Sequence, residues 1–403
     1  MVGGGVIGMS CALALQRRGI AVSVIDPAAL RPASLGNAGH IAVEQVEPLA
    51  SFATLRNLPA QLFFRGGPVA LPPREIGVWL PFALRFARAA TPARFNSGKA
   101  ALKAMAAAAI PAWKRQLEDA GAPELLLENG HFLVWESEAA AQAGRRRWAA
   151  TDTGTVTVRS ANKDELDSIS AHLSQPLAGG LRFTGSAQIA DLDALAAALV
   201  RAFERAGGVR VRGAAAEVRP QEVVLETGEA LAADAVVIAA GTASARLLAP
   251  LGHRVPLIAE RGYHLQAART DWPETLPPVV FEERAMIVTR FRSGLRAAGF
   301  FEFGRPEAPP DPRKWARLRS NLDALGIAFE APVEWVGARP TLPDYLPAIC
   351  RSRTGVYHAF GHQHLGLTLA AATGEAIGAL VSGEKPPFDL SPFSLSRFGG
   401  RSA

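Results

Sequence analysis

The feature that most constrains the fold is a glycine-rich turn at the start of the chain. Residues 3–8 read GGGVIG, so Gly3, Gly5 and Gly8 match the G-x-G-x-x-G pattern of a dinucleotide-binding turn. The first glycine of such a turn allows a tight bend, the second lets a pyrophosphate approach the backbone, and the third lets the helix pack closely on the sheet. The pattern therefore predicts a parallel α/β layer whose first helix points its N-terminus at phosphate.

The residues after the turn complete a strand-helix-strand unit. Residues 6–19, VIGMSCALALQRRG, predict a helix, and residues 20–26, IAVSVID, predict a β-branched strand that ends at Asp26. Asp26 lies 18 positions after Gly8, close to the place of a carboxylate that binds ribose hydroxyls and repels a 2′-phosphate. FAD or NAD is therefore favoured over NADP.

The strand that should precede the turn is short. Only Met1 and Val2 stand before Gly3. From this we expect a truncated or misassigned start, in which loss of the innermost strand weakens the sheet and the cofactor site. A chain extended upstream should then retain more flavin.

Two later segments have the pattern of the second half of an FAD domain. One begins at Asp191 with an amphipathic helix, passes through short strands and ends in a buried strand that stops at Ala240 and Gly241. The other, residues 356–383, reads as a strand, a loop of glycine and histidine, and a helix that opens near Gly366. A helix N-terminus there would stabilise negative charge on a reduced flavin. Together the segments favour FAD over NAD.

The composition excludes other classes of protein. Of the 403 residues 49% are hydrophobic, and two cysteines, Cys11 and Cys350, are too few for a disulfide framework or a structural zinc site. The 43 basic and 37 acidic residues are dispersed, which argues against nucleic acid. The apolar run between Lys103 and Lys114 is far shorter than the roughly 20 residues of a membrane span. We expect a cytoplasmic protein without a signal peptide, with at most peripheral contact to the inner face of the membrane through the helix-like stretch from Val78.

Blocks along nearly the whole chain resemble the D-amino acid oxidase superfamily, most closely its bacterial D-amino acid dehydrogenase branch. The blocks are GGGVIGMSCALALQRRG with Asp26, SLGNAGHI from Ser34, AAGTASARLL from Ala239, ERGYHL from Glu260, GARPTLPDYLPAI from Gly337 and GHQHLGLT from Gly361. The resemblance implies an α/β protein with a glutathione-reductase-like Rossmann domain that binds FAD and an α+β substrate domain made of insertions. The expected FAD domain comprises 1–42, 190–254 and 334–403, and the substrate domain 43–189 and 255–333.

The activity implied by the resemblance is FAD-dependent oxidative deamination of a D-amino acid. Hydride would pass from the α-carbon to flavin N5, giving an imino acid and then a 2-oxo acid. The electrons would pass to a quinone, an electron-transfer protein or oxygen. One alternative substrate is glycine, sarcosine or another N-alkyl or cyclic amino acid such as a D-hydroxyproline. Alternatives of other classes are an accessory flavoprotein subunit without catalysis and a nicotinamide-dependent dehydrogenase.

The resemblance also implies which positions contact FAD. These are Gly3, Gly5, Val6, Ile7, Gly8, Asp26, Ser34, Asn37, Ala38, Gly39, Val218, Ala240, Gly241, Gly361, His362, His364, Leu365, Gly366 and Thr368. Between the two histidines of the last loop, His362 is the better candidate for the flavin side. His40, His362 and His364 lack an accompanying carboxylate or cysteine at ligand spacing, so no metal site is expected.

A substrate carboxylate needs a cation, and the planar fork of arginine makes two parallel charge-assisted bonds to it. Arg339 is the first candidate for this clamp, Arg261 the second and Arg290 the third. Further candidates for substrate contact are Tyr263, His264, Tyr345 and His40. Because side chains alternate along a strand, only one of Tyr263 and His264 can face the site.

Overall fold

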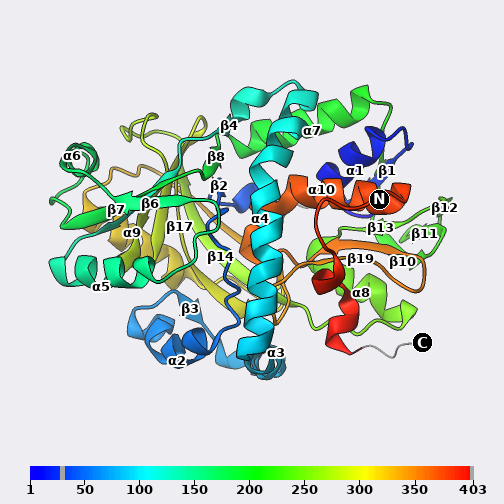
Figure 1. Cartoon of the computed structure of the whole chain (residues 1–403), viewed down its shortest axis with the longest axis horizontal. Coiled ribbons are helices and arrows are strands. Elements are labelled where there is room, and N and C mark those ends of the chain that lie inside the picture. Colours follow the sequence, from blue (N-terminus) through cyan, green and yellow to red (C-terminus); the bar gives the residue numbers. More distant parts are fainter. Residues whose placement is uncertain (28–31, 400–403) are drawn as a thin grey trace.

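The computed structural model describes residues 1–27 and 32–399. Figure 1 shows two lobes on either side of a long upright helix, α4 (Pro92–Ala120). The N-terminus lies in the same lobe as Leu395 and Phe398, which pack against the core around Val2. The lobe with the N-terminus holds a small, mostly parallel sheet, and the other lobe holds a large, mostly antiparallel sheet. This arrangement confirms the predicted combination of an α/β domain with an α+β domain.

The first sheet carries the glycine turn. Its strands in spatial order are β9 (Val209–Arg212), β1 (Ser23–Asp26), β13 (Val237–Ile238), β20 (Tyr357–Phe360) and β19 (Ala348–Arg351), with Val2 between β1 and β13. Only β19 runs antiparallel to its neighbour. The N–H of Val2 donates to the carbonyl of Val237 and its own carbonyl accepts from Ala239, both at 2.8 Å. Two residues thus fill the central strand position that we expected to be lost.

Three helices pack around this sheet, and their bounds are α1 (Val6–Gln16), α7 (Leu192–Arg205) and α10 (Gly366–Ser382). A Cβ on Gly374 of α10 would lie 2.5 Å from the carbonyl of Ser10, so that glycine permits the close crossing of α10 and α1. The helical stretch Gln363–Ser382 is long and apolar enough to span a membrane, but 72% of its apolar window is buried in the fold. It is the central core helix of this lobe.

The second sheet has nine strands. Their order is β18 (Val333–Thr341), β14 (Ile258–Ala267), β17 (Gly294–Gly304), β16 (Met286–Phe291), β15 (Val279–Phe281), β5 (His131–Trp135), β7 (Gly179–Thr184) and β6 (Thr157–Ser160), and β3 (Val69–Ala70) pairs with β17. Helix α9 (Pro312–Leu325) covers one face of β14 and β17 and supplies Trp315 and Leu318 to the core beneath it.

The remaining elements are short. Between the lobes lies the sheet β2 (His40–Ile41), β8 (Ala187–Ile189) and β4 (Leu126–Leu127), and beside β13 lies the antiparallel meander β10 (Ala215–Arg219), β11 (Glu222–Leu225) and β12 (Ala230–Ala232). The other helices are α2 (Phe52–Gln61), α3 (Ile76–Ala89), α5 (Glu138–Ala149), α6 (Lys163–Ser170) and α8 (Ser244–Leu248).

Two expected domain boundaries differ from the structure. All of β18 pairs with β14, so the chain returns to the first sheet after Thr341 and not at residue 334. Helix α4 falls inside the expected range 43–189, but it packs on α1, α7 and α10 in the hydrophobic core of the first lobe. Residues 28–31 and 400–403 of the expected FAD segments lie outside the described residues.

Candidate active site

The three glycines of the turn differ in whether the fold leaves room for a side chain at their position. Gly3 has φ +104°, and a Cβ there would lie 2.4 Å from the carbonyl of Ala239. A Cβ on Gly8 would lie 1.9 Å from the carbonyl of Gly3. The fold itself therefore requires Gly3 and Gly8. A Cβ on Gly5 would meet only ordinary contacts, the nearest at 3.7 Å, so the fold leaves Gly5 free for close approach of a ligand to the backbone.

The end of β1 and the start of α1 fit a dinucleotide. Asp26 Oδ2 accepts a hydrogen bond of 2.5 Å from the N–H of Gly4, so the carboxylate lies against the turn. Burial raises the pKa of Asp26, and the Gly4 hydrogen bond opposes that rise. Helix α1 has no side-chain cap at Gly5 within the described part of the chain, which leaves helix N–H groups for a pyrophosphate. The Ser34 hydroxyl approaches the N–H of Val6 at 3.4 Å.

These contacts predict opposite results for two substitutions in the turn. Gly5→Val should fold with an unchanged melting temperature of the apoprotein but lose bound dinucleotide, because the new side chain blocks the pyrophosphate and not the protein. Gly8→Ala should instead lower the melting temperature, because its Cβ meets backbone. Absorption of bound cofactor and thermal melts measure the two effects, and full cofactor retention by Gly5→Val would contradict the assignment.

The loop after β1 contains Ser34, Asn37, Ala38 and Gly39, four of the expected cofactor contacts. Asn37 Oδ1 accepts from the N–H of Gly39 at 2.8 Å, and Gly39 has φ +77°. The Arg296 guanidinium from β17 donates to the carbonyls of Leu35, at 2.9 Å, and of Asn37. Burial lowers the pKa of Arg296 to about 10. The large sheet therefore fixes this loop through an arginine that the sequence analysis did not single out.

Strand β14 has two faces, and only one of them lies toward the loop after β1, which we call the cofactor loop (residues 34–39). Directly opposed residues of antiparallel strands share a face, and the pairs between β14 and β18 are Glu260–Arg339, Gly262–Gly337 and His264–Trp335. His264 Nδ1 lies 3.1 Å from the carbonyl of Gly36 in the loop, and the Trp335 ring stacks on His264 at 4.8 Å. The face that carries Arg339 is therefore the face toward the cofactor loop.

Arg339 is the centre of a polar cluster on this face. Its Nη1 lies 2.9 Å from Glu260 Oε1, and the Tyr345 hydroxyl donates to Glu260 Oε2 at 3.1 Å. A Cβ on Gly262 would lie 2.4 Å from Arg339 Nη2, so the missing side chain makes room for the guanidinium. Burial and the neighbouring Glu260 raise the pKa of Tyr345 well above its ordinary value. The structure thus unites Arg339 and Tyr345 with a carboxylate, Glu260, that was not predicted.

Two residues in or next to this cluster have a strained backbone, Tyr345 between β18 and β19 and Gln363 just before α10. Tyr345 has φ +56° and Gln363 has φ +45°, a left-handed conformation that is costly for residues other than glycine. The Gln363 side-chain amide donates to the carbonyl of Tyr345, which ties the two strained positions together. The ring of His364 lies 6.2 Å from that of Tyr345, and burial lowers the pKa of His364 to about 4. A neutral His364 therefore borders Arg339.

Arg261 and Tyr263 lie on the opposite face of β14, which corrects their predicted contact with substrate. Arg261 Nη1 and the Tyr263 hydroxyl both bind Glu302 Oε1, at 2.8 and 2.5 Å, and Lys314 Nζ of α9 binds Glu302 Oε2 at 2.7 Å. Their side chains thus face α9 and the core. Arg290 pairs with Glu274 at 3.0 Å. Tyr263 and His264 thus lie on opposite faces of β14, and His264 is on the face that carries Arg339.

Two of the candidate histidines lie outside the cluster around Arg339. His362 Nε2 lies 2.9 Å from Thr373 Oγ1 inside α10, so His364 and not His362 belongs to the cluster around Arg339. The His40 ring packs beside His131, at 4.3 Å between centroids, and not in that cluster. Thr368 Oγ1 accepts from the N–H of Ala42 at 3.0 Å, which leaves the backbone of Thr368 as its possible contact with cofactor.

The other expected cofactor positions lie at the edge of the first sheet. Val6 and Ile7 begin α1, Ala240 and Gly241 follow β13, Gly361 follows β20, and Leu365 and Gly366 stand at the start of α10. Val218 is buried in β10, and its side chain belongs to the core with Val2 and Ile25. Any contact of Val218 with cofactor is therefore through its backbone.

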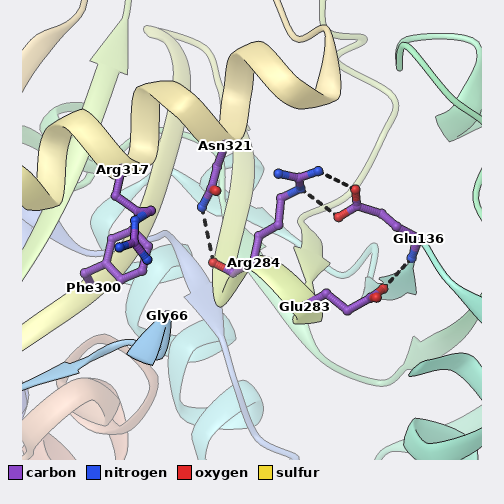
Figure 2. Close-up of a pocket in the computed structure, with 7 residues that line it drawn as sticks. All are labelled: Gly66, Glu136, Glu283, Arg284, Phe300, Arg317 and Asn321. Atoms are coloured by element: carbon purple, nitrogen blue, oxygen red, sulfur yellow. Dashed lines mark hydrogen bonds and ion pairs between the residues drawn. The ribbon is translucent and has the colours of Figure 1, made fainter. Parts of the chain in front are cut away.

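A pocket in the structure is lined by none of the residues of the glycine turn or of the cluster around Arg339. Figure 2 shows its lining, which is Gly66, Glu136, Glu283, Arg284, Phe300, Arg317 and Asn321. Arg284 is paired with Glu136, and Glu283 accepts from the N–H of Glu136. The Arg317 guanidinium packs over the ring of Phe63 at 4.8 Å. Its polar groups bind one another, and none of the predicted site residues lines it, so we assign it no part in the reaction.

The family comparison agrees with this geometry. The family model described as FAD dependent oxidoreductase (DAO) matches residues 1–380. The chain is 31% identical to a D-amino-acid oxidase of Bradyrhizobium diazoefficiens, with 99% of this chain and 98% of that protein covered. It is 28% identical to a D-amino acid dehydrogenase of Cereibacter sphaeroides, with 99% and 94% covered.

Solved structures confirm the fold. Glycine oxidase from Geobacillus kaustophilus superposes with a TM-score of 0.73 at 23% identity, covering 98% of this chain and 97% of that one. Iminodiacetate oxidase from a Chelativorans species gives 0.69 at 21% identity, with the same coverage. At these identities the likeness concerns the arrangement of the chain alone.

Proposed function

Because this chain belongs to the DAO family of FAD-dependent oxidoreductases, we propose that it oxidises a D-amino acid to an imino acid, which water converts to a 2-oxo acid and ammonia. The observation that supports the proposal is the position of Arg339. This cation lies on the face of β14 and β18 that is directed toward the cofactor loop. The names of the two relatives reported above support the D configuration. A nicotinamide cofactor is not required, since FAD is the cofactor of the family.

The protein's part in this reaction is to position the amino acid. Glu260 holds one side of the Arg339 fork, and the remaining N–H groups of the guanidinium can bind the substrate carboxylate. Tyr345 binds the other oxygen of Glu260, so the carboxylate that orients Arg339 is itself fixed. FAD held by the glycine turn would supply the hydride acceptor for the α-carbon, so no protein nucleophile would be required. Correct placement of that carbon supplies much of the acceleration.

Anaerobic reduction of the bound flavin tests the proposal. The purified holoenzyme is mixed with D-amino acids, their L enantiomers, glycine, sarcosine and cis- and trans-hydroxy-D-proline, and flavin absorption is followed. We expect bleaching by one or more D-amino acids and no bleaching by L enantiomers. Bleaching by glycine or sarcosine alone would favour the N-alkyl amino acid alternative. A flavin that stays oxidised with every compound would favour an accessory subunit.

The electron acceptor and the compartment are part of the same proposal. We infer a quinone or electron-transfer protein as acceptor and a place in the cytoplasm, next to the membrane. Exposed Ile76, Leu80 and Leu84 on α3, together with Arg85 and Arg88, support contact with an anionic membrane surface. Reduction of a soluble quinone analogue without formation of peroxide is the expected result. Stoichiometric peroxide would identify oxygen as the acceptor.

The space over Gly262 gives a further prediction. In Gly262→Ala the new Cβ would displace the end of the flexible Arg339 side chain and not the backbone, so the protein should fold and bind FAD normally. A shift of the clamp by about 1 Å should lower kcat/KM for the D-amino acid by about 10- to 100-fold. Gly77→Ala on the open surface of α3 is the matched control, with unchanged kinetics. Equal activity of both variants would place the clamp elsewhere.

A further inference from the structure

Three potential metal ligands meet in the core between the two lobes. His40 belongs to β2, Glu44 follows that strand, and His131 begins β5 of the large sheet. One ligand atom from each residue lies within 4.8 Å of the other two. The exposed fractions are 9% for His40 and 3% for Glu44 and His131, so the cluster is buried.

Two of these three side chains carry a buried polar atom without a hydrogen-bond partner among the described residues. His40 Nε2 and Glu44 Oε2 have no hydrogen-bond partner within residues 1–27 and 32–399, and the 3.8 Å between His40 Nε2 and Glu44 Oε1 exceeds a hydrogen bond. A buried polar group without a hydrogen-bond partner destabilises the folded protein. The His131 ring stacks on Phe183 at 4.2 Å, which offers no polar contact. The unsatisfied polar atoms of the cluster are thus on His40 and Glu44, whereas His131 Nδ1 contacts Ser186 Oγ.

We propose that His40, Glu44 and His131 bind a divalent transition metal, with Zn²⁺ as the best match. Two imidazoles and one carboxylate are a known donor set for zinc, with a fourth position for water. From the 4.8 Å limit, an ion placed among the three atoms lies within about 2.8 Å of each, so shifts under about 1 Å give the usual distances of roughly 2.0–2.2 Å.

A neighbouring hydroxyl supports this assignment. His131 Nδ1 lies 3.0 Å from the buried Ser186 Oγ, a contact of the kind that fixes the ring orientation of metal-binding histidines. Without a cation, burial raises the pKa of Glu44 to about 8 and lowers that of His40 to about 4, so both groups are held neutral. A bound cation would instead favour the ionised carboxylate and the neutral imidazoles that act as ligands.

The site would join the two lobes. His40 follows Gly39 at the end of the cofactor loop, and His131 lies in the large sheet, so a metal would link that loop to β5. The proposal differs from the expectation from sequence that no metal is bound. His40 and His131 are 91 positions apart, and the expectation considered only the histidines in loops near the flavin motifs. The metal would have a structural role, independent of the proposed substrate.

Metal analysis of the holoenzyme tests the proposal. The purified protein is loaded with Zn²⁺, or with Co²⁺ for its visible absorption, and dialysed, and metal per flavin is measured. We expect about one metal ion per chain in the wild type and under about a tenth in Glu44→Gln and His131→Gln. His172→Gln removes a histidine outside the cluster and should retain the wild-type amount. Equal metal in all four proteins would overturn the site.

A second measurement keeps the test valid if the variants fold poorly. Zn²⁺ at a concentration 100 times the dissociation constant should stabilise the wild-type holoenzyme by about 2.7 kcal/mol at 25 °C, a 100-fold shift in the folding equilibrium, and a chelator should reverse the effect. The readout is the melting temperature, which does not depend on activity. A wild-type protein that retains no Zn²⁺ or Co²⁺ after dialysis, with no shift in melting temperature, would contradict the proposal outright.

Discussion

Replacing Arg339 with leucine should lower kcat/KM for the D-amino acid about 30- to 4,000-fold while FAD stays bound. Loss of one partner of a buried charged hydrogen-bonded pair costs about 2–5 kcal/mol, and each 1.4 kcal/mol is about tenfold. Arg339 lies in β18 of the large sheet, and the glycine turn is in the other lobe, so flavin content should not change. The measurement is steady-state kinetics together with the ratio of flavin to protein absorbance.

Two further variants separate substrate binding from stability. Arg339→Leu leaves Glu260 buried without its cation, so a double variant that adds Glu260→Gln should regain stability but not activity. Arg339→Lys keeps the charge but not the planar fork and should recover only part of the binding. Recovery of full activity in the double variant would show that Arg339 serves the fold and not the substrate.

The sequence predicted the cofactor half of this protein well because its signals are local. The bend at Gly3, the close packing at Gly8 and the carboxylate at Asp26 each follow from a few neighbouring residues, and the structure places Gly8 against Gly3 and Asp26 against Gly4. The short start gave no sign of a central strand, because Met1 and Val2 fill that position through hydrogen bonds to strands distant in sequence. That pairing leaves no trace in a local pattern.

The substrate side was harder to predict because it depends on strand register. Arg261 and Glu260 are adjacent in sequence, yet one faces α9 and the other faces Arg339. The alternation of side chains along a strand predicts that Glu260 and Arg261 lie on opposite faces. Only the pairing of β14 with β18 shows which of the two shares a face with Arg339. The same alternation from Arg339 would have marked Trp335 as a neighbour on that face. Glu260 carried a weaker signal, as the one carboxylate in the strand Ile258–Ala267.

The network on the other face of β14 should determine stability and not catalysis. Glu302 binds Arg261 and Lys314, and all three side chains are at most 4% exposed. Glu302→Gln leaves two buried cations without their shared carboxylate, a loss of about 3–5 kcal/mol, so the melting temperature should fall by roughly 5–10 °C. Glu217→Gln, at the exposed pair with Arg219, should leave it unchanged. A raised KM with an unaltered melting temperature in Glu302→Gln would contradict a purely structural role for this network and return Arg261 to the candidates for substrate contact.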